Sequence, residues 1–389
     1  MRPPNPKVSE TAKNYYYNGV SETLGNQVKV HLILGARPNQ MKVAPLFKSL
    51  ESNNVFKPMV IDTGQHFDVN MSAIFQNEFQ MPPPYAELKI GSGSHAIQTG
   101  KIMASYEELC GDEKPDWTIV FGDVNSTLAC SLVAAKMNIP IVHAEAGLRS
   151  WDRTMPEEIN RIMTDSVSTL CWTTTQEASE NLIKEGHQNS SINLIGNLMI
   201  DSLVSMMPRI KNSTKYIELG LEEKDYCVAT FHRPSNVDDI NALNILVDQL
   251  IILSSQIKIV FPVHPRTLKA LQGINRYNQL RQSVAIKILE PLGYIDFLNL
   301  VLHASYVLSD SGGIQEETAY LGIPCFTVRE NTERPITLKY GLNELTKIEL
   351  IGNTYKRNKS LIKKAEPIPF WDGNAAQRAV EHLTGFLNG

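Results

Sequence analysis

The amino-acid sequence predicts an α/β protein built from two doubly wound units, each a parallel sheet with helices on both faces. The chain has 389 residues, which suits two domains better than one. Short apolar runs with the length of buried strands alternate with longer amphipathic stretches that have the length of helices. This alternation starts afresh near Asp225, so we expect two units of similar size.

The first series of strands begins at "VKVHLILG", which ends at Gly35. The later strands of this series are "KPMVID", "DWTIVFGD", "IPIVHA", "TLCWTT" and "INLIGN". Helices are predicted between them in "QMKVAPLFKSLES", "HAIQTGKIMASYEELC" and "STLACSLVAAKM". Strands that alternate with helices in this way pair in parallel.

The second series contains the strands "DYCVATF", "IKIVFPV", "VAIKIL", "ASYVLS" and "CFTVR". Its helices are predicted in "INALNILVDQLIILSSQ", "PRTLKALQG" and "GYIDFLNLVLHA", and "NAAQRAVEHLTGFLNG" reads as a terminal helix. The junction is expected around 200–220. The predicted parts are therefore an N-terminal extension 1–27, an N-terminal domain 28–205, a C-terminal domain 206–368 and a C-terminal helix 369–389.

Composition excludes several classes of protein. The net charge of −4 gives no general affinity for nucleic acid or for an anionic membrane. The five cysteines are scattered without a CxxC pair, which argues against a disulfide framework or a cysteine zinc site. No apolar run approaches the length of a membrane helix, and the N-terminal stretch lacks the apolar core of a secretory signal. We therefore expect a cytoplasmic protein.

Ligands of open α/β sheets bind at the carboxyl ends of the strands, so the residues that follow each strand are the candidates for function. After the first strand, "GARPNQMK" places Arg37 and Lys42 around a helix start, where backbone N–H groups and two cations would hold an anion. A solvated basic turn explains this stretch equally well.

The strongest phosphate signal is "LSDSGGIQEETAYLGIP". A strand is followed by a turn of small residues, Ser311, Gly312 and Gly313, and by a helix from near Ile314 to Gly322. Such a turn lets a diphosphate approach the helix N-terminus. Either Glu316 or Glu317 would accept hydrogen bonds from ribose hydroxyls, although glutamates also simply complement a helix dipole.

Ionisable residues crowd the stretch "HAEAGLRSWDRTMPEEINR", which leaves an apolar strand at His143. Glu145 sits at the strand end, Thr154 is a predicted N-cap, and Glu157 and Arg161 share one helix face. A solvated ion-pair face is the ordinary explanation for such a helix. Two carboxylates beside arginines are also what proton abstraction and donation require.

Further candidates follow other strands. Asp123 lies in "GDVNST", where Ser126 or Thr127 is the expected cap of the next helix. The stretch "VATFHRPSN" places His232 and Arg233 directly after a strand, as an acid and a phosphate ligand. In contrast, "GSGSHA" at 91–96 is weak evidence for a dinucleotide site, because its strand is short and no acid follows at the usual distance.

Taken together, these stretches resemble the UDP-N-acetylglucosamine 2-epimerases, especially the non-hydrolysing branch. The resemblance covers roughly residues 30–345. The matching pieces, in order, are "GARPNQMKVAPL", "TGQHFD", "FGDVNST", "HAEAGLRS", "PEEINR", "GN" at 196–197, "HRPSN", "DSGGIQEE" and "GIPCFTVRENTERP".

The resemblance implies two Rossmann-like domains in a GT-B-like arrangement with the active site in the interdomain cleft. It also implies a homodimer that needs neither NAD nor a metal and serves polysaccharide biosynthesis for the cell envelope. The implied reaction interconverts UDP-GlcNAc and UDP-ManNAc by eliminating UDP to give a 2-acetamidoglucal and then adding UDP back.

The resemblance also implies roles for individual residues. The catalytic positions of the family match Asp123, Glu145, Glu157 and His232. Its substrate-binding positions match Arg37, Lys42, Arg161, Arg233, Ser311, Gly312, Gly313 and Glu317. Gln65 and His66 match a regulatory motif, but Phe67 and Asp68 depart from it, which puts activation by UDP-GlcNAc in question.

Asn39 and Ile336 replace glutamates that are common in the family. Both replacements fall beside the expected site, so UDP-2,3-diacetamido-glucuronate is a second candidate substrate. The sequence also leaves open a hydrolysing 2-epimerase that releases ManNAc and UDP, a GT-B glycosyltransferase, and a non-catalytic protein that binds nucleotide sugars.

Overall fold

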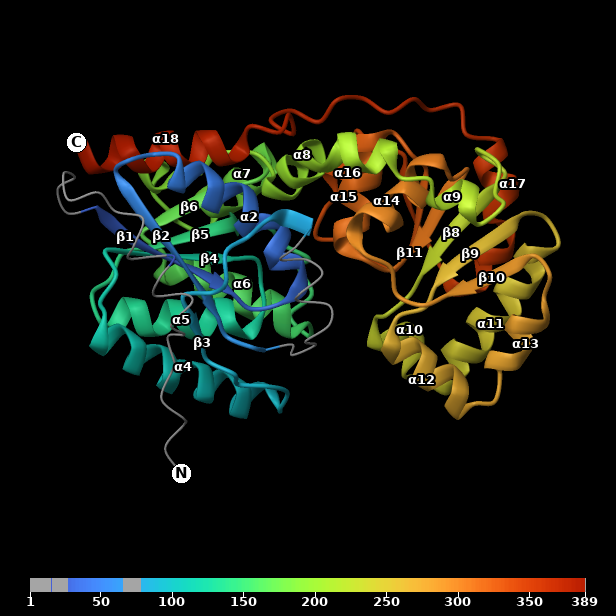
Figure 1. Cartoon of the computed structure of the whole chain (residues 1–389), viewed down its shortest axis with the longest axis horizontal. Coiled ribbons are helices and arrows are strands. Elements are labelled where there is room, and N and C mark those ends of the chain that lie inside the picture. Colours follow the sequence, from blue (N-terminus) through green and yellow to red (C-terminus); the bar gives the residue numbers. More distant parts are fainter. Residues whose placement is uncertain (1–14, 16–26, 66–77, 389) are drawn as a thin grey trace. The chain divides into compact units, whose positions relative to one another are not determined.

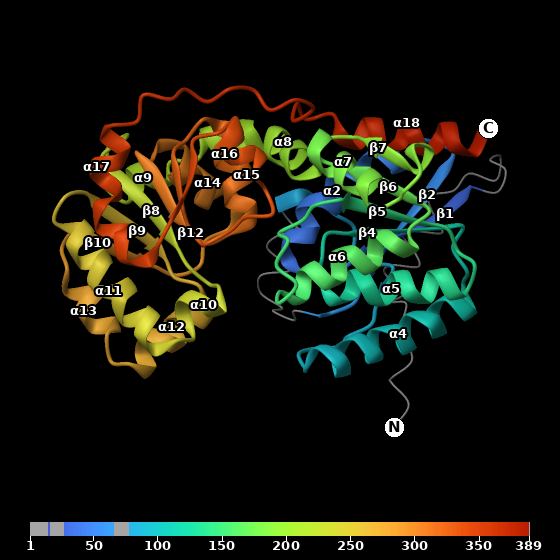
Figure 2. The same ribbon diagram turned by 180° about the vertical axis from the view of Figure 1, so that it is seen from behind.

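The computed structural model describes residue 15 and residues 27–65 and 78–388 (Figure 1). The chain forms two compact units: unit 1 contains Met1–Val204 and Pro369–Gly389, and unit 2 contains Ser205–Ile368. Each unit is an α/β structure with a parallel sheet, which confirms the predicted fold class (Figures 1 and 2). The boundary near 204 falls inside a helix, α8 (Leu198–Asn212).

The sheet of unit 1 has the strand order β3-β2-β1-β4-β5-β6-β7, and its strands pair in parallel. The direction of winding reverses between β1 and β4, which is where doubly wound folds bind ligands at the carboxyl ends of the strands. The strands are β1 (Val28–Leu34), β2 (Phe56–Asp62), β3 (Ala86–Glu87), β4 (Trp117–Phe121), β5 (Ile141–Ala146), β6 (Leu170–Thr173) and β7 (Ile192–Leu194). The helices are α2 (Arg37–Glu51), α4 (His95–Asp112), α5 (Asn125–Lys136), α6 (Pro156–Val167), α7 (Gln176–Lys184) and α18 (Ala375–Asn388).

The sheet of unit 2 has the order β10-β9-β8-β11-β12-β13 and is also parallel, with its reversal between β8 and β11. The strands are β8 (Tyr226–Thr230), β9 (Lys258–Pro262), β10 (Ile286–Leu289), β11 (Tyr306–Ser309), β12 (Cys325–Val328) and β13 (Asn343–Thr346). The helices are α9 (Lys215–Glu218), α10 (Pro234–Val237), α11 (Ile240–Ser254), α12 (Pro265–Gly273), α13 (Tyr277–Gln282), α14 (Tyr294–His303), α15 (Gly312–Leu321), α16 (Ile336–Lys339) and α17 (Thr354–Lys359).

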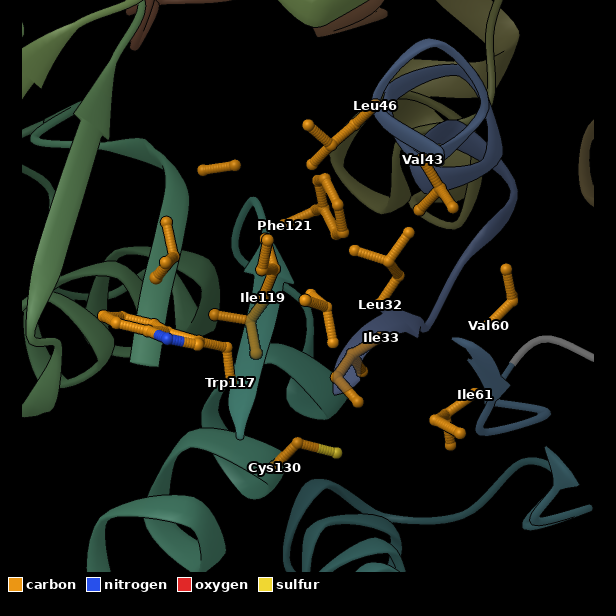
Figure 3. Close-up of a cluster of buried hydrophobic side chains, with 14 of the residues drawn as sticks. Leu32, Ile33, Val43, Leu46, Val60, Ile61, Trp117, Ile119, Phe121 and Cys130 are labelled. Atoms are coloured by element: carbon orange, nitrogen blue, oxygen red, sulfur yellow. The ribbon is translucent and has the colours of Figure 1, made fainter. Parts of the chain in front are cut away.

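The core of unit 1 surrounds its central strands (Figure 3). Leu32 of β1 and Ile119 of β4 are completely buried, because helices pack on the sheet. Figure 3 shows Leu46 of α2 and Cys130 of α5 on opposite sides of these strands. With both faces covered, the strand ends are where this unit can expose polar side chains to a ligand. Among the described helices, none combines the length and the apolarity needed to cross a membrane.

The helix α18 belongs to unit 1, although it follows the whole of unit 2 in the chain (Figure 1). The carboxylate of Asp201 accepts hydrogen bonds from the backbone N–H groups of Ala375 (3.1 Å) and Ala376 (2.7 Å). These bonds satisfy two of the donors that a helix start leaves unpaired. The side chain of Leu383 is completely buried in the core of unit 1.

Candidate active site

Glu145 occupies an unusual backbone position at the end of β5. The register between β5 and β6 shifts between Ala144 and Ala146, so Glu145 is the bulged residue. Its φ angle is 73°, a left-handed value that is uncommon for a residue other than glycine. Bulges re-aim side chains, and such strained positions cluster at functional sites. The geometry therefore makes Glu145 a candidate functional residue independently of its motif.

The carboxylate of Glu145 forms an ion pair with Lys42 of α2, and both side chains are buried. Gly122, at the end of β4, lies against this pair. A Cβ atom on Gly122 would lie 3.0 Å from Glu145 Oε2 and 3.2 Å from Lys42 Nζ, and its φ angle of 65° also favours glycine. The structure thus joins the ends of β4 and β5 to α2, and a solvated basic turn does not describe Lys42. The side chain of Arg37 lies outside the described part of the chain.

Asp123 follows Gly122 and forms an ion pair with the buried Arg161 of α6. The guanidinium also donates to Glu158 Oε2 from Nε (2.9 Å) and from Nη2 (2.7 Å). Burial alone would raise the pKa of Glu158, but hydrogen bonds from backbone N–H groups and from Arg161 hold it below its usual value. Two carboxylates therefore hold Arg161, and one of them, Asp123, keeps 29% of its side chain exposed.

Glu157 lies apart from this network. Its side chain is exposed at the start of α6, and Arg161 pairs with Glu158 instead. Neighbouring residues of a helix point about 100° apart, so only one of the two glutamates can face the sheet. The structure therefore brings together Lys42, Glu145, Asp123 and Arg161 around Gly122, and it leaves Glu157 open to solvent.

Both predicted helix caps, Thr154 and the choice of Ser126 or Thr127, are wrong. The helix α6 starts at Pro156 after Met155 without a side-chain cap, and Thr154 Oγ1 donates to Asp152 Oδ1 at 2.6 Å. The helix α5 starts at Asn125 after Val124. Thr127 Oγ1 donates to the carbonyl oxygen of Phe121 (2.8 Å), and Ser126 Oγ donates to Gln65 Oε1 (2.6 Å). These hydroxyls fasten the turn that carries Asp123.

Gln65, one of the two predicted regulatory residues, is buried. Its side-chain oxygen also accepts a hydrogen bond from the backbone N–H of Ser126 at 3.0 Å. His66, the other predicted regulatory residue, lies outside the described residues. Gln65 therefore links the chain just after β2 to the start of α5.

In unit 2, Asp310 directly follows β11 and is completely buried. Its carboxylate accepts hydrogen bonds from the backbone N–H groups of His232 (3.1 Å) and Arg233 (3.0 Å) and from Asn236 Nδ2 (3.1 Å). Its Oδ1 atom lies 3.0 Å from Nδ1 of His232. Burial alone would raise the pKa of Asp310, but these partners, His232 first, hold it below its usual value. Asp310 therefore fixes both the backbone and the ring of His232, whose side chain is 40% exposed.

The predicted phosphate turn forms the start of α15. This helix begins at Gly312, two residues before the expected start, and no described side chain caps it at Ser311. A Cβ atom on Gly312 would lie 2.8 Å from Nη1 of Arg334, so glycine leaves room for this guanidinium. Uncapped N–H groups at a helix start attract anions. The helix ends at Leu321, and Gly322 has the left-handed φ angle of 67° that the motif predicts.

Glu317, the predicted ribose ligand, is buried on α15. Burial raises its pKa to about 8, a hydrogen bond with Tyr294 opposes this rise, and the charge of Glu316 adds to it. Its Oε1 atom has no hydrogen-bond partner among the described residues. Its neighbour Glu316 differs, because it forms an ion pair with Nε of Arg334 at 2.8 Å.

Sequence reasoning missed several residues of these networks, among them Asp310 and Glu158. Asp310 had a signal, since it is the first residue after a strand and precedes the small-residue turn. No signal distinguished Glu158 from Glu157. Both glutamates have a spacing to Arg161 that suits an ion pair on a helix, so the sequence cannot say which of them forms it.

Comparisons with known proteins agree with this geometry. The profile of the family described as UDP-N-acetylglucosamine 2-epimerase matches residues 48–384. The chain is 39% identical over 371 residues to a UDP-N-acetylglucosamine 2-epimerase of Methanocaldococcus jannaschii, covering 92% of this chain and 99% of that protein. It is 34% identical to the UDP-2,3-diacetamido-2,3-dideoxy-D-glucuronate 2-epimerase of Pseudomonas aeruginosa, with 92% and 99% coverage.

Solved structures agree as well. The crystal structure of the M. jannaschii UDP-GlcNAc 2-epimerase in complex with UDP-GlcNAc and UDP superposes with a TM-score of 0.85 at 39% identity, covering 92% of this chain and all of that one. A UDP co-structure of MnaA from S. aureus gives 0.84 at 29% identity, with 93% and 97% coverage. The two parallel sheets, the motifs at their strand ends and these matches lead to one conclusion: the chain belongs to the UDP-N-acetylglucosamine 2-epimerase family of isomerases.

Proposed function

We propose that the protein is a non-hydrolysing epimerase that interconverts UDP-GlcNAc and UDP-ManNAc. The observation that carries this proposal is the strained, buried Glu145, ion-paired with Lys42 beside the turn of Asp123. A carboxylate paired with an ammonium is anionic and can accept a proton. The C2 proton of the sugar is weakly acidic, so its removal needs such a preorganised base.

In the proposed reaction, a base removes the proton from C2 while the bond between C1 and the UDP oxygen breaks. The products of this step are 2-acetamidoglucal and UDP. UDP then adds back to C1, and an acid delivers a proton to the opposite face of C2. The candidates for base and acid are Asp123, Glu145 and Glu157. Atoms and electrons balance without NAD or a metal.

Residues of unit 2 bind UDP in this proposal. The uncapped start of α15, with Ser311, Gly312 and Gly313, would take the diphosphate together with Arg233. His232, fixed by Asp310, would donate to the diphosphate as it leaves. The Oε1 atom of Glu317, which has no hydrogen-bond partner among the described residues, would accept hydrogen bonds from the ribose hydroxyls. The relatives crystallised with UDP-GlcNAc and UDP support this choice of ligand. We further propose a cytoplasmic homodimer.

A second candidate substrate is UDP-2,3-diacetamido-glucuronate. Asn39 stands where a glutamate is common, and the side chain is buried with its Nδ2 atom 3.3 Å from the carbonyl oxygen of Phe121. Ile336 replaces the other glutamate at the start of α16. The 34% identity to an epimerase named for that sugar supports this candidate.

The test is proton NMR of the purified protein with UDP-GlcNAc in heavy water, without added NAD or metal. UDP-ManNAc that carries deuterium at C2 is the expected product. Free ManNAc with UDP would assign the protein to the hydrolysing branch. No reaction, followed by epimerisation of the diacetamido-glucuronate sugar under the same conditions, would assign the second substrate. No reaction with either sugar would leave a binding protein or a glycosyltransferase.

A further inference from the structure

A buried aspartate of α6, Asp165, clamps the bulge that carries Glu145. Its Oδ1 atom lies 2.6 Å from Nδ1 of His143, and its Oδ2 atom accepts a hydrogen bond from the backbone N–H of Gly147 at 3.2 Å. These partners are two residues before and two residues after Glu145. One carboxylate therefore holds both ends of the strained segment.

The imidazole of His143 extends this clamp to the neighbouring strand. Its Nε2 atom lies 2.8 Å from the carbonyl oxygen of Gly122, the residue before Asp123. A carbonyl oxygen can only accept a hydrogen bond, so Nε2 carries a hydrogen. Asp165, Nδ1 of His143 and Gly122 thus form one chain that ties the turn of Asp123 to the bulge of Glu145.

The charges around this chain require a second hydrogen on the ring. Burial alone would raise the pKa of Asp165, but the charges and hydrogen bonds of His143 and Arg149 hold it below its usual value. Oδ2 of Asp165 accepts from the backbone N–H of Gly147 and from Arg149, donors that favour the ionised carboxylate whatever the state of the ring. An ionised carboxylate only accepts, so Nδ1 of His143 also donates. Arg149 donates from Nη2 to Asp165 (2.7 Å) and to Glu185 (2.5 Å), so two cations meet two carboxylates.

A further ionisable neighbour, Cys171, does not disturb this balance. Cys171 faces His143 across the β5–β6 pairing, and burial raises the pKa of its thiol, which leaves it neutral. Buried charges persist when each has a partner, and removing one partner is strongly destabilising. The geometry therefore describes a buried, positively charged ring of His143. The carboxylates of Asp165 and Glu185 balance its charge and that of Arg149.

We propose that Asp165 and His143 are positioning residues, which lock the bulge of Glu145 and the turn of Asp123 in one geometry for proton transfer at the sugar. This inference rests on the proposed epimerase function for its kinetic consequence. The charged state of the His143 ring does not depend on that function, because it is inferred from the contacts of the ring with Asp165 and Gly122.

The protein contains a natural contrast in His31, a completely buried histidine of β1 in the same sheet. Its Nδ1 atom lies 3.2 Å from the hydroxyl of Tyr106. Burial lowers the pKa of His31 to about 3, so this ring is neutral. His31→Gln is therefore a matched control for loss of a buried histidine that does not touch the clamp.

The kinetic test compares Asp165→Asn and His143→Leu with His31→Gln. We expect kcat to fall roughly 100-fold in the first two, because small displacements of reacting groups have effects of this size. KM and UDP affinity should change little, and the control should keep its kcat. His143→Gln, whose amide N–H can still reach the carbonyl of Gly122, should retain more activity than His143→Leu. Wild-type kcat in Asp165→Asn, or equal rates in the two His143 variants, would overturn the inference.

The second test reads the ring nitrogens directly by NMR on histidine labelled with nitrogen-15, and it needs no turnover. In the wild-type protein we expect both nitrogens of His143 to carry hydrogens and only one nitrogen of His31 to do so. Asp165→Asn should make the His143 ring neutral, and if this variant does not fold, the wild-type spectrum alone decides. A neutral His143 ring in the wild type would overturn the inference. A charged ring in a protein that does not epimerise either sugar would reject the proposed function only.

Discussion

Replacing Glu317 by glutamine should stabilise unit 2, because this carboxylic acid is buried where its charged form is disfavoured. Burial raises its pKa to about 8, whereas an unfolded glutamate titrates near 4.5. A group whose folded pKa is raised gives its full stability below pH 4.5 and loses it as the pH rises towards 8. Glutamine has a similar shape and no charge, so the variant should escape this loss.

The size of the effect follows from the two pKa values. Between pH 4.5 and pH 7 the unfolded chain has released the Glu317 proton, whereas the folded chain still holds it. This interval is 7 − 4.5, or about 2.5 pH units. At about 1.36 kcal/mol per unit, the cost of this retained proton is about 3 kcal/mol. The variant should therefore unfold at a temperature roughly 6–12 °C higher at pH 7, for a domain of this size.

Differential scanning calorimetry of the full chain at pH 5 and pH 8 measures this difference. The gain of Glu317→Gln should be small at pH 5 and large at pH 8. The control is Glu316→Gln, on the same helix, which should lose stability at both pH values because it leaves Arg334 without its 2.8 Å partner. A Glu317→Gln variant with equal gains at pH 5 and pH 8 would refute the claim that Glu317 is protonated at neutral pH.

Four further predictions follow from the same contacts. UDP binding should release a proton below pH 8, because ribose hydroxyls favour the ionised Glu317; calorimetric titration in two buffers measures this release, and its persistence in Glu317→Gln would contradict the assignment. Glu145→Gln should abolish deuterium exchange at C2 and leave UDP affinity nearly unchanged; wild-type exchange would remove Glu145 from the mechanism. Asp310→Asn should lower kcat by roughly 10–100-fold, since a charged hydrogen bond to His232 is lost; steady-state kinetics with an unchanged kcat would argue against that role. Gly147→Ala should destabilise the protein by roughly 2–5 kcal/mol in urea unfolding, because its φ angle is 77° and a Cβ would overlap the carbonyl oxygen of Ala178; an unchanged midpoint would show that the loop relaxes.

The architecture was predictable because buried parallel strands need short, nearly continuous apolar runs, and the helices between them need longer amphipathic stretches. Two strands, β3 and β13, escaped prediction. The first has only two residues, and the second, "NELT", is largely polar at the edge of its sheet. Local sequence carries little signal for such edge strands, since pairing with a neighbour rather than burial defines them.

The candidate site was predictable in its residue types but not in its pairings. Thr154 has the hydrogen-bonding capacity of a helix cap, yet its hydroxyl bonds Asp152. Glu157 and Glu158 both have suitable spacing to Arg161, and only the packing of α6 on the sheet selects Glu158. The bulge at Glu145 arises from the pairing of β5 with β6, two segments that no local pattern relates to each other.

The position of α18 has a consequence for biosynthesis. A ribosome makes residues 1–204 first, then the whole of unit 2, and only then the helix that packs against α2 and joins the core of unit 1. Until that moment Asp201 lacks the two N–H groups that it holds in the finished protein. Unit 2 is complete before unit 1 during translation, so chains arrested inside 369–389 should expose apolar side chains of the core of unit 1 and attract chaperones.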